Sequence, residues 1–506
     1  MTGTEGRGPD LAALMAAALA DHRAGRLQAA ERGYRQVLAA APGHLGAVFN
    51  LAVALEQLGR PAEAEAGYRH GLSLAPGQAF GLQRLRGLLG RQGRNAELLT
   101  LADEVAASGG DPGEAALARA TALAGLGRDG EAVEAFQAAQ AAGADAFQTL
   151  VGLGLSCSSL GRYEDALAAF DEALALRPGD PEVLNRRAPT RLRIGDFAGG
   201  WADYEARWRT PGFLAGPGAW ASQALSRLLV DPRREQVVGR HILAVAEQGI
   251  GDQVMFASLL PDLLRDAARV TCVADARLVR LFSASFPTVE VLPASATPLS
   301  CEGYDAVVAM GSLGRLYRNR REDFPGTPYL SPSEAVRARW AERLGPRPGG
   351  LRVGLSWRGG TVATRRSERS IPLERFRPLL TLPGCEVVSL QYGDVGEEVA
   401  AVNAGLERPI RLFPPAEIDD LEELAGLVSQ LDVVVSVQTA LVHLAGATGA
   451  QALVLAPRHA EWRYGAEGPD MAWYRSVRLF RQGDDRDWAA VVGQVAEAVG
   501  ARLPSS

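Results

Sequence analysis

The chain contains no lysine: its 53 basic residues are all arginines, against 59 acidic residues. The absence of a lysine amine excludes P-loop phosphoryl transfer, Schiff-base chemistry and Ser–Lys hydrolysis, because each of these needs that amine. The formal net charge is −6, whereas a protein that coats nucleic acid needs a basic surface to neutralise phosphates. No nucleic-acid partner is therefore expected.

Cysteine and histidine are scarce as well. The four cysteines, Cys157, Cys272, Cys301 and Cys385, lie far apart and form no C-x-x-C pair. The six histidines include no H-E-x-x-H or H-x-x-x-H pair. Because structural zinc sites depend on such closely spaced ligands, none is expected here.

Long hydrophobic runs are also missing. No uncharged apolar run reaches the roughly 18 residues that a membrane-spanning helix requires, and the glycine-rich N-terminus lacks a basic segment followed by an apolar one. We therefore expect no membrane span and a location in the reducing cytoplasm. The 506 residues, of which 47% are hydrophobic, suffice for about two to four domains of roughly 100–200 residues.

An internal repeat fills the first two-fifths of the chain, a region without tryptophan. A glycine recurs there every 34 residues, and most units carry an alanine five residues and an aromatic residue nine residues after it. The glycines are Gly25, Gly59, Gly93, Gly127, Gly161 and Gly195. Glycine permits a tight turn between two helices, alanine lets the helices approach closely, and the aromatic ring fills the remaining space.

This pattern resembles the tetratricopeptide repeat over about residues 11–208. The unit around Gly93 departs most, with Leu98 at the alanine position and Ala102 at the aromatic position. The resemblance implies an α-solenoid whose concave face holds a peptide or a protein. The alternative is an array that only stabilises or dimerises the rest of the chain, and a homodimer is therefore a further expectation.

Beyond residue 212, short apolar runs alternate with helical segments. The expected strands are 241–246, 270–273, 289–292 and 305–309, and then 352–356, 386–390, 433–437 and 452–455. Buried parallel strands typically read as such continuous apolar runs. The turn-prone segment 346–350 separates the two series. The sequence thus predicts a solenoid at 1–212 and two Rossmann-like domains at 213–346 and 347–506, with a ligand site at the carboxyl ends of their strands.

The first candidate for chemistry follows the first expected strand. Gly249 and Gly251 let the backbone approach a ligand, and Asp252 comes next, at the start of a helix expected over 253–264. Its carboxylate could accept the proton of an attacking hydroxyl, or it could simply cap the helix. Dinucleotide binding is only weakly favoured, because Val254 occupies the last position of a G-x-G-x-x-G pattern.

The second candidate follows the strand that ends at residue 437. Thr439 is expected to cap a helix that runs to residue 447, and free amides at a helix N-terminus form an anion site. His443 lies one turn further on the same face. It could donate a hydrogen bond to a phosphate or a ribose hydroxyl, or it could only pack in the core.

The third candidate is an arginine-rich segment after a glycine pair, Gly359 and Gly360. Its four arginines are Arg358, Arg365, Arg366 and Arg369. Since lysine is absent, arginine must neutralise any diphosphate, and its fork geometry suits that task. The alternative is a solvated basic loop.

A D-x-D pattern at Asp485 and Asp487 formally matches metal-dependent sugar transferases. It directly precedes a helix expected from about Trp488, and acidic residues favour the positive end of the helix dipole. We therefore interpret the pattern as a helix start and expect no metal.

Taken together, residues 241–506 resemble the bacterial glycosyltransferases related to ADP-heptose–lipopolysaccharide heptosyltransferases, in particular a branch in which tetratricopeptide repeats precede the catalytic region. The W-x-x-Y-E-x-R-W motif at 201–208 resembles that branch too. The segments that carry the resemblance are AEQGIGD at 246–252, VGLSW at 353–357, RSIPL at 369–373, VSLQ at 388–391, DL at 420–421, SVQTALVHLAGATG at 436–449 and WRY at 462–464.

The resemblance implies a GT-B fold, a nucleotide-sugar donor bound by the C-terminal domain, inversion at the anomeric carbon, and neither metal nor other cofactor. Asp252 matches the catalytic aspartate of the family. Arg369 stands where the family usually has lysine, and Gln438 replaces an aspartate. The expected donor-binding residues are Gly249, Gly251, Trp357, Arg358, Arg369, Gln391, Gln438, Thr439, Ala440 and His443.

The fused repeats shift the expected acceptor towards a protein, by analogy with repeat-containing O-GlcNAc transferases and flagellin-modifying transferases. The hypothesis is transfer to a Ser or Thr hydroxyl of flagellin or another surface protein held by the repeats. Two alternatives stay open. One is a transferase for a lipopolysaccharide or polysaccharide acceptor; the other is a non-catalytic adaptor with a vestigial GT-B region, which Gln438 favours.

Overall fold

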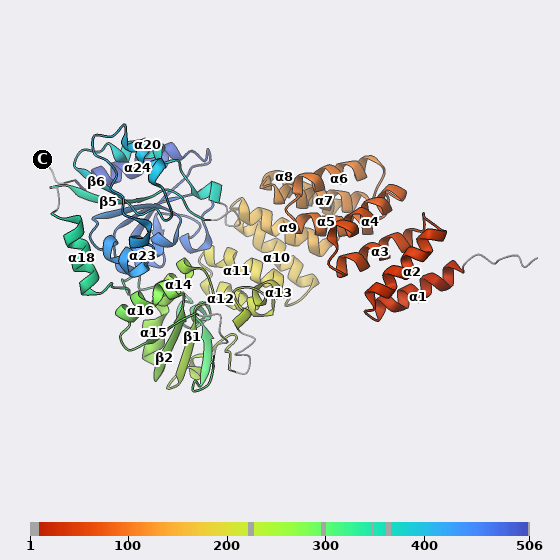
Figure 1. The fold of residues 1–506 in the computed structure, drawn as a ribbon, viewed down its shortest axis with the longest axis horizontal. Helices are drawn as coiled ribbons and strands as arrows, with labels where there is room; N and C mark the ends of the chain where they lie inside the picture. Colours follow the sequence, from red (N-terminus) through yellow and green to blue (C-terminus); the bar gives the residue numbers. More distant parts are fainter. Residues whose placement is uncertain (1–9, 221–226, 295–299, 347–348, 361–365, 504–506) are drawn as a thin grey trace, which may run out of the picture. The chain divides into compact units, whose positions relative to one another are not determined.

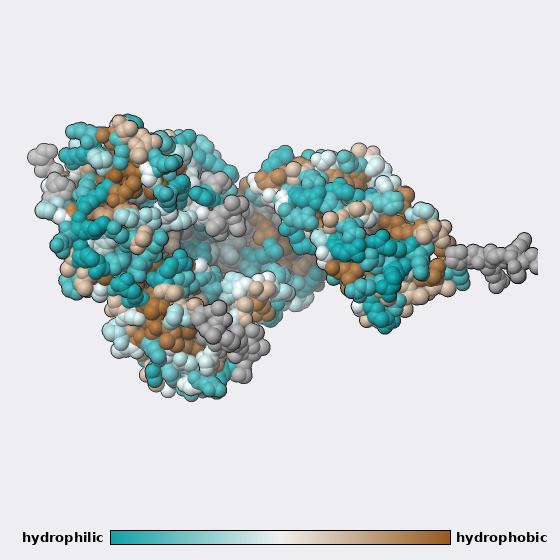
Figure 2. Space-filling view, in the orientation of Figure 1, coloured by the Kyte–Doolittle hydropathy of each residue, from teal (hydrophilic) through white to brown (hydrophobic). Residues whose placement is uncertain are grey.

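The computed structural model describes residues 10–220, 227–294, 300–346, 349–360 and 366–503. The chain divides into two compact units, Met1–Val183 and Leu184–Ser506 (Figure 1). The division falls within a helix of the last repeat, whereas the boundary expected from the sequence is at residue 212. Hydrophilic residues predominate on the face of each unit that Figure 2 shows, and no helix within the described ranges is long and apolar enough to cross a membrane.

The first unit is a succession of short helices, each packed against the next. Its helices are α1 (Leu11–Arg23), α2 (Leu27–Ala40), α3 (Leu45–Gln57), α4 (Pro61–Leu74), α5 (Ala79–Arg91), α6 (Asn95–Ala107), α7 (Pro112–Gly125), α8 (Asp129–Ala141), α9 (Ala146–Ser159) and α10 (Tyr163–Leu176). The series continues across the division with α11 (Pro181–Arg193) and α12 (Phe197–Tyr204). The helical array predicted from the repeat is confirmed.

The repeat residues have the roles that their spacing predicts. All six glycines adopt φ between 70° and 88° at the turn inside each helix pair, a conformation that glycine reaches without strain. The alanines and aromatic residues after them are buried. In the irregular unit, Leu98 and Ala102 are buried too, so a larger residue at the alanine position accompanies a smaller one at the aromatic position. Such a swap keeps the packed volume nearly constant.

A four-stranded parallel sheet with the order β3-β2-β1-β4 begins the α/β part of the second unit. Its strands are β1 (His241–Val245), β2 (Arg269–Ala274), β3 (Glu290–Pro293) and β4 (Ala306–Ala309). The accompanying helices are α13 (Pro211–Leu214), α14 (Ile250–Phe256), α15 (Leu260–Asp266), α16 (Val279–Ser285), α17 (Leu313–Tyr317) and α18 (Glu334–Leu344). All four strands match the expected ones.

The second sheet has six strands in the order β6-β5-β7-β8-β10-β9, all parallel except β9. The strands are β5 (Leu351–Ser356), β6 (Cys385–Ser389), β7 (Val433–Val437), β8 (Ala452–Ala456), β9 (Asp470–Met471) and β10 (Tyr474–Arg481). The helices are α19 (Arg377–Leu380), α20 (Gly396–Asn403), α21 (Pro415–Ile418), α22 (Leu421–Val428), α23 (Ala440–Thr448) and α24 (Trp488–Gly500). Strands β9 and β10 are not among the expected strands. β9 has only two residues, and polar residues interrupt the apolar ones in β10.

One predicted helix is wrong in its extent. The continuous helix expected over 253–264 starts earlier, at Ile250, and α14 stops at Phe256. A single 3₁₀ turn separates it from α15, which has Pro261 in its first turn. Within a helix, proline is tolerated only in the first turn, because it lacks the N–H that later turns need for their hydrogen bonds. As a result, α14 is a short helix that carries Asp252 in its own first turn.

Candidate active site

The site lies where α14, which follows β1, meets α23, which follows β7. Gly251 faces the first turn of α23: a Cβ atom at this position would lie 3.3 Å from Cδ2 of His443 and 3.4 Å from Cα of Ala440. Gly249 is the residue before α14, and a Cβ atom there would lie 3.9 Å from Oδ2 of Asp252. The segments around Asp252 and Thr439, which the sequence places in separate domains, thus come together at the carboxyl ends of β1 and β7.

Asp252 points from α14 towards the second α/β domain. Nε of Arg463 donates to Oδ1 of Asp252 at 2.6 Å, and the two side chains are 18% and 15% exposed. Burial acts to lower the pKa of Arg463, but the Asp252 carboxylate outweighs it and the pKa is raised. The residue before α14 is Gly249, so the alternative in which Asp252 serves as the helix cap is wrong.

Backbone contacts join the start of α23 to the loop after β5. Oγ1 of Thr439 accepts a hydrogen bond from the amide of Leu441 at 3.2 Å, which confirms the predicted cap. A Cβ atom on Gly359 would lie 2.7 Å from the carbonyl oxygen of Gln438 and 2.8 Å from Cγ2 of Thr439. Only glycine permits this approach, because a backbone oxygen cannot move aside. The amide of Gly359 donates to the carbonyl of Arg369 at 3.1 Å, so the arginine segment joins the same cluster.

Gln438 has an unusual environment. Its side chain is 1% exposed, and among the residues that the structure describes neither the nitrogen nor the oxygen of its amide has a hydrogen-bond partner. An unpaired buried amide costs roughly 1–3 kcal/mol of stability. Buried polar groups left unpaired in a native protein call for a reason other than packing.

Two of the predicted donor-binding residues have side chains with structural roles. Trp357 is wholly buried in the core beneath the second sheet, and its Nε1 donates to Glu398 at 2.9 Å. Oε1 of Gln391 accepts from the amides of Trp357 and Arg358 at 3.0 and 2.8 Å. Core packing and the turn after β5 thus occupy the side chains of Trp357 and Gln391, and their predicted part in donor binding stays a prediction.

The arginines of the third candidate are placed unequally. Arg358 pairs with Glu398 at 3.1 Å, and Arg366 is exposed. Arg369 is partly buried, and its positive charge acts on the hydroxyl of Tyr464, next to Arg463. Arg365 lies outside the described residues. Arg369 is thus the member of this segment that the structure brings to the site.

His443 is buried, with 4% of its surface exposed. Its Nδ1 lies 3.2 Å from the hydroxyl of Tyr474. Burial, helped by the positive charge of Arg463, lowers the pKa of His443 to about 3. The imidazole is therefore neutral at neutral pH, and it cannot neutralise a phosphate as a cation.

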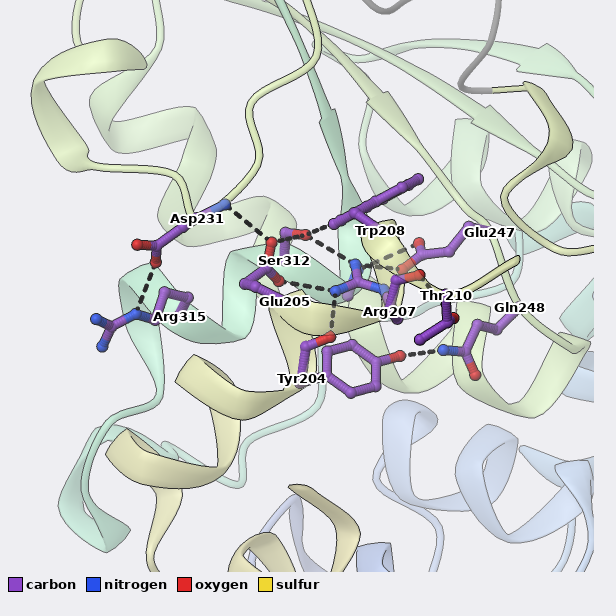
Figure 3. A network of polar contacts seen from close by, with 11 residues as sticks. Tyr204, Glu205, Arg207, Trp208, Thr210, Asp231, Glu247, Gln248, Ser312 and Arg315 are labelled. Atoms are coloured by element: carbon purple, nitrogen blue, oxygen red, sulfur yellow. Dashed lines mark hydrogen bonds and ion pairs between the residues drawn. The ribbon is translucent and has the colours of Figure 1, made fainter. Parts of the chain in front are cut away.

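A buried ionic network supports the loop that precedes Asp252 (Figure 3). Arg207, which is 1% exposed, donates to Glu205 at 2.8 Å, to Glu247 at 3.0 Å and to Ser312 at 2.7 Å. Its guanidinium also lies 4.2 Å from the ring centroid of Tyr204. Burial raises the pKa of Glu247, and the charge of Arg207 opposes this shift.

This network gives the W-x-x-Y-E-x-R-W motif a structural role. Glu247 closely follows β1, and the next residue, Gln248, donates from its side chain to the hydroxyl of Tyr204. Nε2 of Gln253 in turn donates to the carbonyl of Gln248 at 2.7 Å. Residues on either side of the glycines are therefore held by the motif and by α14 itself, which fixes the position of Asp252.

The D-x-D pattern forms part of a helix start, as predicted. Asp487 accepts from the amide of Ala489 at 3.1 Å and caps α24, while Asp485 accepts from the amide of Asp487 at 3.1 Å. No group of three or more potential metal-ligating side chains occurs among the residues that the structure describes.

The two glycines before Asp252 should respond differently to alanine. Gly251→Ala places a methyl group against the ring of His443 and the backbone of Ala440, and such overpacking typically costs about 1–3 kcal/mol. Gly249→Ala adds a methyl group that meets only Oδ2 of Asp252, at an ordinary contact distance of 3.9 Å and a negative φ, and should change the free energy of unfolding by less than about 0.5 kcal/mol. Thermal unfolding of both variants measures this difference, and equal stabilities would contradict the close approach of α14 and α23.

Known protein families match the repeat region. Two tetratricopeptide-repeat models match, one over residues 22–88 and the other over 117–181 and 151–209. The first part of the chain is a tetratricopeptide-repeat array. This array is also similar to a tetratricopeptide repeat protein from Parabacteroides merdae, at 18% identity over 40% of this chain and 80% of that one, with a TM-score of 0.34.

Similarity extends beyond the tetratricopeptide-repeat array. Protein FlbA of Caulobacter vibrioides is 31% identical over 361 residues, which are 65% of this chain and 57% of that protein. The match thus spans little more than half the length of that curated relative. A glycosyl transferase family 9 structure from Veillonella parvula is similar over 53% of this chain and 94% of its own, at 13% identity and a TM-score of 0.37.

Three features of the site had no role assigned from the sequence. Arg463, the partner of Asp252, belongs to the W-R-Y segment that carries the family resemblance, so its importance could have been suspected. Tyr329 and Tyr474 had no such signal, because each lies in an irregular or unrecognised element. Tyr474 reaches His443 because β10 packs against α23 within the second α/β domain, whereas Tyr329 comes from the first domain and reaches Tyr474 through the packing of the two domains.

Proposed function

We propose that the chain is an inverting, metal-independent glycosyltransferase of the GT-B type. The observation that carries this proposal is the position of Asp252, in the first turn of α14 and opposite the start of α23, with Arg463 from the second domain against it. A carboxylate facing a helix N-terminus combines a general base with an anion site. That pairing suits attack by a hydroxyl on a sugar whose leaving group is a nucleoside diphosphate.

In the proposed reaction, Asp252 takes the proton of the attacking hydroxyl while the hydroxyl oxygen forms a bond to the anomeric carbon. The bond from that carbon to the donor phosphate breaks on the opposite face, and the electron pair leaves with the nucleoside diphosphate. The amides at Thr439 and Ala440, together with Arg369, would stabilise the departing charge. Preorganised donors of this kind are often worth about 3–4 kcal/mol each.

The acceptor in this proposal is a Ser or Thr hydroxyl of a protein held by the tetratricopeptide-repeat array. The support is the array itself, because such solenoids present extended concave surfaces that bind proteins and peptides. Flagellin is a first candidate acceptor to test. A lipopolysaccharide or polysaccharide acceptor would leave the array as a docking module only.

The decisive experiment exposes the purified full-length chain to a panel of nucleotide sugars and measures binding by calorimetry and donor consumption by chromatography. We expect one donor to bind and to be consumed in the presence of chelator, since no metal is required. Intact mass of co-expressed candidate proteins then reports the acceptor, as an added mass of one or more sugars.

A non-catalytic adaptor is the competing function, and one observation favours it. Gln438 replaces the aspartate of the resembling family, and no described residue is a hydrogen-bond partner of its buried amide. If no nucleotide sugar in a broad panel binds or is consumed, the transferase proposal fails and the adaptor is supported.

A further inference from the structure

Four groups from both α/β domains form a continuous hydrogen-bonded chain. The hydroxyl of Tyr329 donates to the carbonyl of Val254 in α14 at 2.8 Å. That hydroxyl lies 3.2 Å from the hydroxyl of Tyr474, which lies 3.2 Å from Nδ1 of His443 in α23. This hydrogen-bonded chain therefore begins at α14, the helix that carries Asp252, and ends at Nδ1 of His443 in α23.

Packing fixes both tyrosines in this chain. The ring of Tyr474 lies against Gly446, where a Cβ atom would come within 2.3 Å of the ring. The amide of Tyr329 donates to the carbonyl of Ala447 at 2.9 Å. Tyr329 and Tyr474 both pack against α23 within about one turn of His443. The Tyr329 hydroxyl also lies 3.5 Å from the carbonyl oxygen of Met255, a second acceptor on α14.

The order of the protons in this chain follows from its first member. A carbonyl oxygen only accepts, so the single hydroxyl proton of Tyr329 goes to Val254. Tyr329 can then only accept from Tyr474, which uses the proton of Tyr474. The hydroxyl oxygen of Tyr474 must therefore accept from His443, and Nδ1 of His443 carries the proton.

A neutral imidazole has one N–H proton. Because Nδ1 of His443 carries it, Nε2 is left with a free lone pair. Nε2 has no protein hydrogen-bond partner in the described part of the chain. The adjacent Cδ2 atom packs against Gly251, one residue from Asp252, and the charge of Arg463 acts on the ring. The free nitrogen thus belongs to the region between α14 and α23.

We infer that Tyr329 and Tyr474 lock His443 in the Nδ1-protonated form, so that Nε2 accepts a hydrogen bond from a hydroxyl group of the bound donor. This inference rests on the proposed transferase function for the identity of the ligand, but the tautomer itself does not. It replaces the expectation that His443 donates to a phosphate, because two acceptors repel each other. Tyr329 and Tyr474 are positioning residues in this scheme.

The tautomer can be measured directly on the ligand-free, full-length protein labelled with ¹⁵N-histidine. Nitrogen chemical shifts distinguish a protonated from a bare ring nitrogen, and only six histidines need to be resolved. His443→Phe assigns the signal by its disappearance. We expect Nδ1 to be protonated and Nε2 to be bare at pH 7; a proton on Nε2 would overturn the inference.

Tyr329→Phe provides the matched perturbation, since it removes one oxygen and keeps the ring. Tyr474 is then free to donate to His443, and we expect the proton to move from Nδ1 to Nε2. A histidine held by packing alone would keep its tautomer. An unchanged spectrum in the folded variant would therefore contradict control of the tautomer by the hydrogen-bonded chain. Tyr317→Phe, whose hydroxyl instead contacts Asp266 at 3.1 Å, should leave the His443 signal unchanged.

The ligand is tested with inorganic pyrophosphate, with the donor found in the panel, and with donor analogues that each lack one hydroxyl. We expect His443→Phe to bind pyrophosphate as the parent does but to bind the donor about 10-fold more weakly. One deoxy analogue should bind both proteins equally. Equal loss for pyrophosphate would overturn the hydroxyl assignment, whereas failure of every donor to bind would defeat the transferase proposal and leave the tautomer result standing.

Discussion

Asp252→Asn is expected to lower the turnover number by on the order of 10²–10⁴-fold, because an amide cannot take the proton of the attacking hydroxyl. Donor binding should change much less, since this substitution keeps the size of the side chain and removes only its charge. Steady-state kinetics with the donor identified in the panel separates the two effects, as a fall in kcat with a nearly constant KM.

The loss of this charge also leaves Arg463 without its partner, so stability must be checked alongside activity. A thermal unfolding curve shows whether the variant is folded at the assay temperature. Asp485→Asn is the matched control. Asp485 lies in the D-x-D pattern at the start of α24, and among the described residues its side chain bonds only to the backbone amide of Asp487. Near-normal turnover by folded Asp252→Asn protein would show that another group removes the proton.

Arg207→Met is expected to lower the free energy of unfolding by about 3–5 kcal/mol, the usual cost of removing one partner of a buried ion pair. Arg207 is the cation between Glu205 and Glu247, and all three side chains are at most 6% exposed. Methionine fills much of the space but leaves two carboxylates facing each other. Chemical denaturation measures the change, and Arg209→Met, at an exposed position on the same segment, should cost less than about 1 kcal/mol.

The destabilisation by Arg207→Met should depend on pH in a definite direction. Burial already raises the pKa of Glu247 above its ordinary value of 4.5, and Arg207 opposes that shift. Without Arg207 the folded protein binds a proton that the unfolded chain releases above pH 4.5, so stability falls as pH rises from there through the raised pKa. The variant should therefore be closest to the parent near pH 5 and weakest near pH 8. An equal deficit at both values would mean that Glu247 does not change its protonation state over this range.

The arrangement of the repeats and strands could be predicted because their signals are local. A glycine every 34 residues marks the turn inside each helix pair, because that turn needs a positive φ. The eight expected strands are largely apolar runs, as strands of a buried parallel sheet typically are. The strands β9 and β10 were not predicted, because β9 is only two residues long and β10 is not a continuous apolar run. Pro261 ended α14 earlier than the helical pattern indicated, since one backbone group outweighed the hydrophobic spacing.

The site could be predicted only in part, and Trp357 and Gln391 show why. Trp357 and Gln391 were expected to touch a ligand because they lie in segments typical of the resembling family. The side chain of Trp357 is in the core, and that of Gln391 holds the turn after β5. Sequence spacing locates a segment at the carboxyl end of a strand, but it does not say which side chains point outward.

By itself, the sequence determined that the chain is a repeat solenoid followed by two parallel α/β domains, and that Asp252 and Thr439 each stand at the start of a helix after a strand. Only the tertiary structure decided that these helices meet, that Arg463 is the partner of Asp252, and that His443 lies at the end of a hydrogen-bonded chain through two tyrosines. The physical reason is that periodicity and backbone preference act between neighbours along the chain, whereas ion pairs, burial and proton order depend on groups that folding brings together from distant segments.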